Sequence, residues 1–176
     1  MNVLIAFDKF KDSLNAHEAC EIAATEIASL HPEWNLETAP LSDGGDGFCK
    51  ILTESRQGRL YKEKVHGPRF EIVDALLGVV ELERLEPELQ KWLNVPPRGK
   101  ISIIEMAQAS GLHHLAQDER DLWQTSTVGV GELIARAVEL ESKALLIGVG
   151  GSATNDLGLG TLEALGLQFI ASQDKP

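Results

Sequence analysis

The sequence predicts an α/β protein built on a largely parallel sheet, with helices on both faces and one appended antiparallel hairpin. Short apolar runs alternate with segments whose apolar residues recur every three to four positions, which is typical of strands alternating with amphipathic helices. The first run, residues 3–7, is continuously apolar, as expected of a strand buried on both faces of a parallel sheet. Polar clusters follow several of these runs, where doubly wound sheets place their ligand crevices.

The first part of the chain contains two predicted strand–helix pairs. After the strand at residues 3–7, a helix is expected over residues 16–30, because Asn15 and Glu18 have the spacing of a capping box and Pro32 closes the segment. A second strand is expected at residues 36–41. A shorter helix, residues 46–53, follows a glycine-rich turn.

The middle of the chain departs from strand–helix alternation. Residues 60–65 and 70–77 flank a Gly67-Pro68 turn and are predicted to form an antiparallel hairpin. Residues 81–100 are charged and contain three prolines, so we expect a surface excursion with at most one short helix at residues 88–93.

The last part returns to alternation. Strands are expected at residues 101–106 and 144–149, and an amphipathic helix is expected between them at residues 127–140. A further helix is expected from residue 155 or 156 to 165, with Gly166 as its stop, and another strand begins at residues 167–171. We expect the runs 3–7, 36–41, 101–106 and 144–149 to share one sheet.

Composition excludes several classes of protein. Sixteen basic and 27 acidic residues give 16 − 27 = −11 and form no basic run, which argues against nucleic acid and anionic membranes as partners. No run reaches the roughly 18 apolar residues of a membrane helix, and the first run lacks the basic flank of a secretory signal, so we expect a cytoplasmic protein. Cys20 and Cys49 are interpreted as two reduced structural thiols. Oligomeric state is left open, with a homo-oligomer among the options.

The first two polar clusters combine charge with a turn. In the first, residues 8–13, the lysines Lys9 and Lys11 can point the same way beside a helix start, which suits a carboxylate or phosphate, although a solvated turn is the alternative. The second, residues 42–47, combines glycines with Asp43 and Asp46, which could hold Mg²⁺ or accept a proton. A glycine-rich turn with an Asp helix cap explains that cluster equally well.

The third and fourth clusters offer hydroxyls and backbone amides. Residues 124–127 precede a helix, and an ordinary threonine cap is the alternative to a ligand site. Residues 148–156 run from a strand through glycines to a polar helix start, where amides could converge on an anion and Asp156 could reach a metal. This segment also matches a loose dinucleotide fingerprint, which keeps a nucleotide-binding oxidoreductase open, whereas the P-loop motif is absent.

Five motifs occur in the order and at the spacings of a known family: DKFKDSL (8–14), LSDGGDG (41–47), IIEMAQASGL (103–112), TSTVGVGELI (125–134) and GVGGSATNDLGLG (148–160). Together they resemble the type 1 glycerate kinase family of bacteria, and GGSATND is the most specific of them. The resemblance implies ATP-dependent phosphorylation of D-glycerate, usually to 2-phosphoglycerate, with ATP and Mg²⁺ as cofactors. Members are roughly twice this length, so residues 1–176 are expected to be an N-terminal portion that lacks the second α/β domain and is inactive alone.

The motifs also fit the needs of phosphoryl transfer, which asks a protein mainly for positioning and charge neutralisation. The expected catalytic residues are Lys9 and Lys11 for anionic groups, and Asp43 and Asp46 for the metal or the base role. Asp156 is the expected metal ligand. The residues expected to bind substrate or nucleotide are Asp8, Ser13, Gly44, Gly45, Thr127, Gly150, Gly151, Ser152, Thr154 and Asn155. The competing hypothesis is a non-catalytic small-anion-binding or regulatory module.

Overall fold

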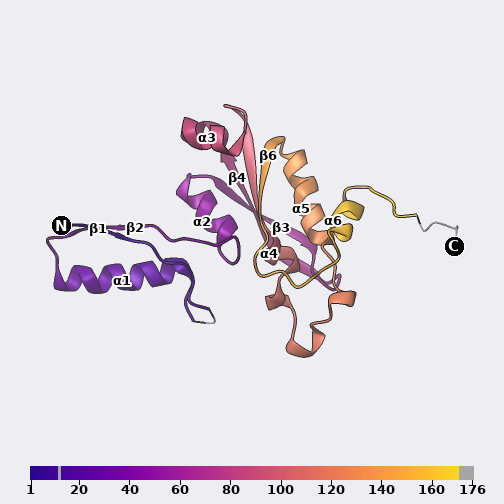
Figure 1. Ribbon diagram of the computed structural model, residues 1–176, viewed down its shortest axis with the longest axis horizontal. Helices are drawn as coiled ribbons and strands as arrows, with labels where there is room; N and C mark the ends of the chain where they lie inside the picture. The colour runs from indigo at the N-terminus through magenta and orange to yellow at the C-terminus, as the bar shows by residue number, and fades with distance from the viewer. Residues whose placement is uncertain (12, 171–176) are drawn as a thin grey trace.

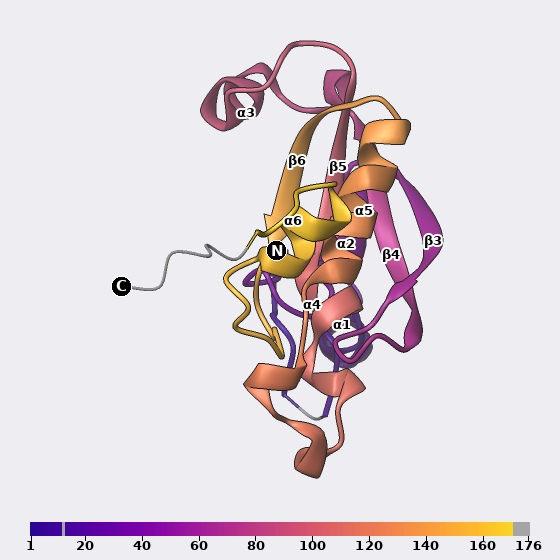
Figure 2. The same cartoon turned by 90° about the vertical axis from the view of Figure 1, so that its right-hand side faces the viewer.

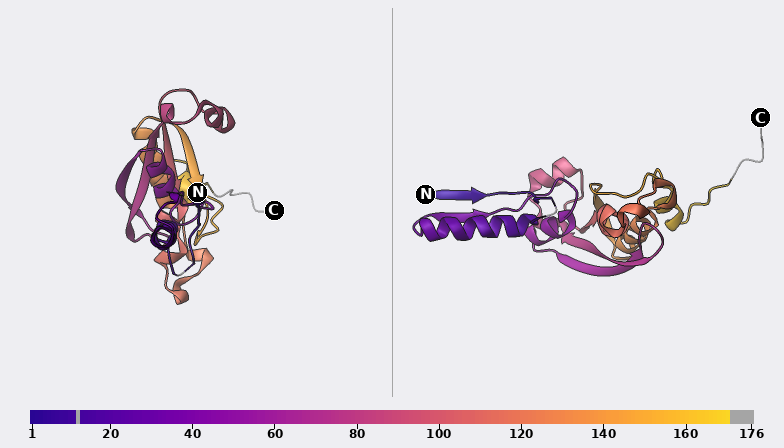
Figure 3. Two further views of the ribbon diagram at one scale, coloured as in Figure 1. Left: turned by 90° about the vertical axis from the view of Figure 1, so that its left-hand side faces the viewer. Right: turned by 90° about the horizontal axis from the view of Figure 1, so that it is seen from below.

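The computed structural model describes residues 1–11 and 13–170 and confirms the α/β class. Its strands form two separate sheets, a parallel pair in the order β1-β2 and a four-stranded sheet in the order β3-β4-β5-β6. The first pair and its helix extend away from the larger sheet, and α6 (Leu159–Ala164) lies at the opposite end of the molecule (Figures 1 and 3).

The small unit consists of β1 (Asn2–Ile5), α1 (Ala16–Leu30) and β2 (Asn35–Thr38). The predicted capping box is confirmed: the Asn15 side chain accepts from the Glu18 amide at 3.0 Å, and the Glu18 carboxylate accepts from the Asn15 amide at 3.0 Å. Helix α1 buries only Ala16, Ala19 and Cys20. Only a short apolar stripe therefore attaches the helix to the strands.

The larger sheet is mixed. Its strands are β3 (Arg59–His66), β4 (Ile72–Glu81), β5 (Lys100–Glu105) and β6 (Ser142–Gly148). Strand β4 pairs antiparallel with β3 and β5, and only β5 and β6 pair in parallel. The four strands lie side by side in Figure 2.

The expectation that the four predicted runs share one sheet is therefore wrong, although the two pairs that they form, β1-β2 and β5-β6, are each parallel as expected. A strand has two edges, and both edges of β5 are occupied, one by β4 and the other by β6. The hairpin is thus an integral part of the sheet, and β1 and β2 pair only with each other. Local periodicity identified the strands, but it does not encode which edges meet.

Helices cover both faces of the larger sheet, as predicted. Successive residues of a strand point to opposite faces, and in β4 Leu77 joins one core cluster while Val80 joins the other. Helix α5 (Val128–Glu139) supplies Leu133 to the first cluster. Helix α2 (Phe48–Ser55) supplies Cys49 to the second.

Residues 81–100 contain more structure than the expected single short helix. After β4 ends at Glu81, a 3₁₀ turn, η1 (Leu82–Arg84), places Leu82 in the core, and α3 (Pro87–Leu93) follows with no buried residue. The chain then returns to β5. Helix α3 nevertheless packs on the same core cluster through the half-buried Leu89 and Leu93, so this segment is attached at both η1 and α3.

The helices near the C-terminal end differ from expectation at their starts. Strand β5 ends at Glu105 and α4 (Met106–Ser110), which was not predicted, begins at once. Helix α6 (Leu159–Ala164) begins later than residue 155 or 156, because Gly158 adopts a φ of 75° and occupies the N-cap. Residues 167–170 form no strand, and the last residue of that expected strand lies outside the described residues. Within the described part of the chain, no helix has the length and apolarity needed to cross a membrane.

Candidate functional site

A cleft with a volume of about 710 Å³ opens among the loops and helix starts that lie between the two sheets. Its walls come from the loop between β1 and α1, the loop between β2 and α2, the starts of α1 and α2, the loop after β6, and three residues of the segment after α4: Leu112, His113 and Arg120. That segment contains the 3₁₀ turns η2 (Leu112–His114), η3 (Gln117–Glu119) and η4 (Leu122–Gln124), and Arg120 lies between the last two. The predicted site residues that line the cleft are Lys9, Lys11, Ser13, Asp43, Gly45, Asp46, Gly150 and Gly151.

An ion pair between the first and second clusters lies in this cleft. The Lys9 Nζ donates to Asp43 Oδ1 at 3.0 Å and lies 3.8 Å from Asp8 Oδ1. The hydrogen bond to Asp43 raises the pKa of Lys9. The same bond, helped by the Gly45 amide at 3.1 Å, lowers the pKa of Asp43. At neutral pH both groups are therefore charged.

Two glycine-rich loops pack backbone against backbone beside this pair. The Gly150 amide donates to the Gly44 carbonyl at 2.9 Å. A Cβ added at Gly150 would lie 2.7 Å from Gly45 Cα, and one added at Gly148 would lie 2.6 Å from the Gly44 carbonyl oxygen. Glycine is required here because any side chain would separate the loop that carries Asp43 from the loop after β6.

The loop after β6 is also held from its other side. The Leu112 amide donates to the Gly151 carbonyl at 2.9 Å, and the Ala153 amide donates to the Ser110 carbonyl at 2.8 Å. These bonds bring η2 and the following segment to the cleft. The loop is therefore fixed by neighbours on both sides and positions its amides rigidly.

This arrangement disfavours the dinucleotide interpretation. The fingerprint requires a helix to begin directly after the glycines. Here α6 begins only at Leu159, and Gly150 contacts another loop.

The third cluster and the end of the fourth lie behind the cleft. The Asp156 carboxylate accepts from the amides of Thr127 (2.8 Å), Gly158 (3.0 Å) and Gly160 (3.1 Å), and from the Thr127 hydroxyl at 2.9 Å. Although burial opposes the shift, these bonds, led by the Thr127 amide, hold the pKa of Asp156 below its ordinary value. The carboxylate is thus occupied in joining the starts of α5 and α6, which disfavours the metal role expected for it.

Other predicted binding residues are likewise not in the cleft lining. Asp8 accepts from the Lys9 amide at 2.6 Å. The Thr154 hydroxyl donates to the Thr125 carbonyl at 3.2 Å. Ser152 bridges to Gly111, and Asn155 is exposed. Gly44 contributes its carbonyl to the loop contact. Their ligand roles stay predictions.

The four clusters therefore converge only in part. Members of the first, second and fourth share the cleft, whereas the third supports it through Asp156. The expected reason, a common sheet edge, is wrong because β1 and β2 belong to a separate sheet. The loops meet through backbone packing instead.

The sequence reasoning missed several residues of the cleft wall. Lys50, His113 and Arg120 line it. Burial lowers the pKa of His113, with a further contribution from His114. The proximity of these residues comes from tertiary packing, and no spacing in the sequence signals it.

Sequence reasoning also missed Glu105, a carboxylate buried at the end of β5 and only 1% exposed. Its Oε2 accepts from the Cys49 amide at 3.2 Å, and its Oε1 accepts from Gln108 Nε2 at 3.3 Å. Burial raises the pKa of Glu105. Helix α2 has Gly47 at its N-cap and no side-chain cap of its own, so Glu105 supplies the missing acceptor from another element.

The carboxylates of the cleft could hold Mg²⁺ only if a nucleotide supplied some of its ligands. Within the described residues, no group of three or more His, Cys, Asp or Glu side chains could hold a metal. Asp43 and Asp46 line the cleft, and Mg²⁺ typically needs only one or two carboxylates when phosphate oxygens and waters complete its shell.

Comparisons with known proteins agree on one family. The family model described as "Glycerate kinase family" matches residues 3–176. A glycerate kinase from Haemophilus influenzae is 37% identical over 176 residues, covering 100% of this chain and 42% of that protein. A glycerate kinase from Bacillus subtilis is 39% identical, covering 97% of this chain and 40% of that protein. The Escherichia coli protein named glycerate 2-kinase is 35% identical over 96% of this chain.

A solved structure shows the same relationship. The crystal structure described as glycerate kinase 2 of Salmonella typhimurium LT2 matches with a TM-score of 0.69 and 34% identity. The match covers 94% of this chain and 40% of that one. The chain thus spans about two fifths of the length of the relatives it matches.

Proposed function

The chain belongs to the glycerate kinase family, and from this premise we propose that the full-length protein containing it transfers the γ-phosphoryl group of Mg-ATP to D-glycerate, giving 2-phosphoglycerate and ADP. The observation that carries the proposal is the cleft in which the Lys9–Asp43 pair lies beside two interlocked glycine loops. A positive side chain, an ionised carboxylate and rigid amides are the parts that phosphoryl transfer requires.

The Lys9–Asp43 pair gives the site a fixed acceptor. The ammonium of Lys9 keeps Asp43 ionised and oriented. We assign Asp43 or Asp46 to accept the proton of the attacking hydroxyl while its oxygen bonds to phosphorus and the bond to the ADP oxygen breaks. Lys9 and Lys11 then neutralise charge on the transferring group. Mg²⁺, bound through the nucleotide and these carboxylates, would supply further charge neutralisation.

The glycine cradle limits what can enter beside the pair. A Cβ at Gly45 would lie 3.1 Å from Asp43 Oδ1 and 3.3 Å from Lys9 Nζ. This space is therefore open to a small ligand group because residue 45 has no side chain. Backbone amides in such a space favour a compact anion.

The chain alone is proposed to lack turnover. It spans about 40% of its relatives, and an open cleft cannot exclude water from a phosphoryl group. For residues 1–176 by themselves, anion binding without catalysis is thus the second candidate function. The two are distinguished by measuring binding and turnover on the same preparations.

The test of the proposed function is a coupled ADP-release assay on the full-length protein with D-glycerate and Mg-ATP. Lys9→Ala and Asp43→Asn should each lower kcat/KM by about 10²-fold or more, the scale of losing one preorganised charge contact. Absence of glycerate-dependent ADP release from the wild-type protein would reject the proposed function. Near-normal turnover in both variants would reject only the roles assigned to this pair.

A further inference from the structure

Arg120 adds a positive charge to the cleft, and the proposed phosphoryl transfer assigns this side chain no role. It lies between η3 and η4 and lines the same cleft as Lys11 and Ser13, which come from the loop before α1. Arg120 and Lys11 are far apart in the sequence, so only the tertiary fold makes them neighbours of one cavity. Two basic side chains of different elements thus face a shared space.

The two acidic residues adjacent to Arg120 in the sequence, Glu119 and Asp121, are engaged with other groups. The Glu119 carboxylate accepts from the Ala116 amide at 3.1 Å and lies 3.7 Å from Arg69 Nη1. The Asp121 carboxylate accepts from the Trp123 amide and from Gln124 Nε2, both at 3.0 Å. Over residues 1–11 and 13–170, no ion pair or side-chain hydrogen bond involves the Arg120 guanidinium. Its donors are therefore available to a ligand.

The balance of charge in the cleft favours an anion. Its lining includes the basic residues Lys9, Lys11, Lys50 and Arg120 and the acidic residues Asp43 and Asp46. Lys9 forms an ion pair with Asp43, and even when this pair is set aside, three basic residues, Lys11, Lys50 and Arg120, face one acidic residue, Asp46. In a protein of net charge −11, such a local excess is unexpected for a merely solvated surface.

We propose that Arg120, together with Lys11, forms an anion subsite of the cleft that binds a carboxylate or phosphoryl group. A guanidinium presents paired donors that match the two oxygens of such a group, and it stays charged at every physiological pH. Lys11 adds a point charge from the loop before α1. The identification of the ligand as the glycerate carboxylate or a nucleotide phosphate rests on the proposed function, whereas the subsite itself does not.

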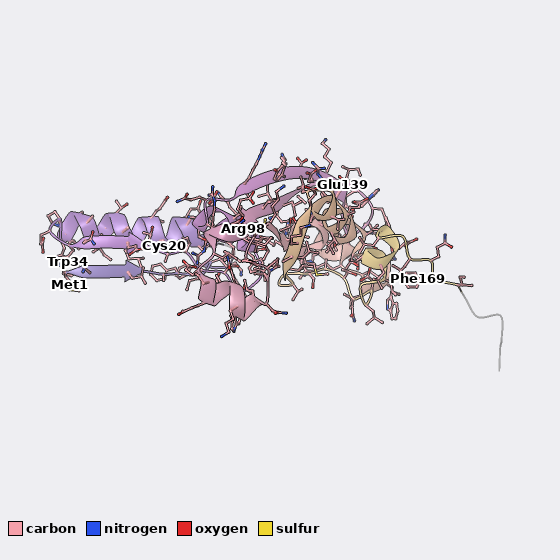
Figure 4. The ribbon with its side chains drawn as sticks, turned by 90° about the horizontal axis from the view of Figure 1, so that it is seen from above. Met1, Cys20, Trp34, Arg98, Glu139 and Phe169 are labelled. Atoms are coloured by element: carbon pink, nitrogen blue, oxygen red, sulfur yellow. The ribbon has the colours of Figure 1, made fainter. Side chains whose placement is uncertain are left out.

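The test compares Arg120→Met with Arg98→Met in the full-length protein. Arg98 is an exposed arginine between α3 and β5 that does not line the cleft (Figure 4). Its replacement therefore removes the same charge from a position outside the proposed subsite. Isothermal titration with D-glycerate, glycerol, Mg-ATP and inorganic phosphate separates the two sources of the anion, because glycerol lacks the carboxylate. Arg120→Lys and thermal melting of each variant control for geometry and folding.

We expect Arg120→Met to lower the affinity for one anionic ligand by about ten- to a hundredfold, the range for a hydrogen bond to a charged group. Arg98→Met should leave the affinity for every ligand unchanged. Arg120→Lys should recover part of the loss. A selective loss for D-glycerate assigns the carboxylate to the subsite, and a selective loss for Mg-ATP or inorganic phosphate assigns a phosphate; either supports the subsite. Unchanged affinity for every anion in a folded Arg120→Met protein would overturn it. If the wild-type protein binds phosphate through Arg120 but neither glycerate nor ATP, the proposed function fails while the subsite stands.

Discussion

Replacing Gly150 by alanine tests the contact that joins the two glycine loops. The added methyl group would lie 2.7 Å from Gly45 Cα and 2.8 Å from the Gly45 amide nitrogen, well inside van der Waals contact. The obstacle is main chain, which cannot rotate away as a flexible side chain can. The loops must therefore separate.

The size of the effect follows from two costs. Inserting a methyl group into a close-packed position typically costs about 1–3 kcal/mol. Separation of the loops also strains or breaks the 2.9 Å hydrogen bond from the Gly150 amide to the Gly44 carbonyl, which is worth about 1 kcal/mol. We expect a loss of about 2–4 kcal/mol in the free energy of unfolding, a large part of a typical stability.

Urea denaturation followed by far-UV circular dichroism measures the loss, and calorimetry with inorganic phosphate measures the effect on the cleft. Gly158→Ala is the matched control. A Cβ at Gly158 meets nothing within 4 Å, so its cost of about 1–2 kcal/mol comes from the φ of 75° alone, and anion binding should be unchanged. If Gly150→Ala changes stability by less than about 0.5 kcal/mol and leaves binding intact, the loops do not pack as described.

Three further predictions concern buried groups and the chain itself. Burial raises the pKa of Glu105, so between its ordinary and its raised pKa the folded protein binds a proton that the unfolded chain does not. The free energy of unfolding of the wild-type protein should therefore fall as pH rises through this window, and Glu105→Gln should remove this dependence. If urea denaturation from about pH 5 to pH 8 gave the same pH dependence for the wild-type protein and Glu105→Gln, the prediction would be contradicted. Cys49, with its pKa raised to about 12, and Cys20, 1% exposed, should react with a thiol reagent such as dithionitrobenzoate only on unfolding, and rapid labelling of the native protein would be inconsistent with their burial. Purified residues 1–176 should release no ADP in response to glycerate, and measurable turnover would show that this part carries a complete site.

The elements of the fold could be predicted because they depend on local patterns. The capping box of α1 and the apolar period of α5 both identified helices that the structure contains. The sheet assignment failed because strand pairing depends on distant edges. A buried parallel strand and a central strand of a mixed sheet have the same apolar sequence, so the pairing of β4 with β5 left no local signal.

The site could be predicted where chemistry and turn geometry coincide. Lys9, Asp43 and Gly150 were identified because charged or glycine-rich segments after strands suggest ligand loops, and all three line the cleft. Asp156 has the same kind of local sequence but serves as a structural acceptor. Arg120 and Glu105 were missed because only the tertiary structure brings Arg120 to the cleft and buries Glu105 at the end of β5.

The two sheets are joined by contacts that surround the cleft. Helix α1 buries only Ala16, Ala19 and Cys20, so the small unit has little core of its own, and one segment joins it to α2. That segment carries Asp43 and the glycines that contact the loop after β6, and α2 packs on β4 and β5 of the larger sheet. The contacts that shape the cleft are therefore the same ones that join the two sheets. If the proposed subsite holds an anion between Lys11 of one part and Arg120 of the other, that anion would add to this junction and would couple ligand binding to the relative placement of the two sheets.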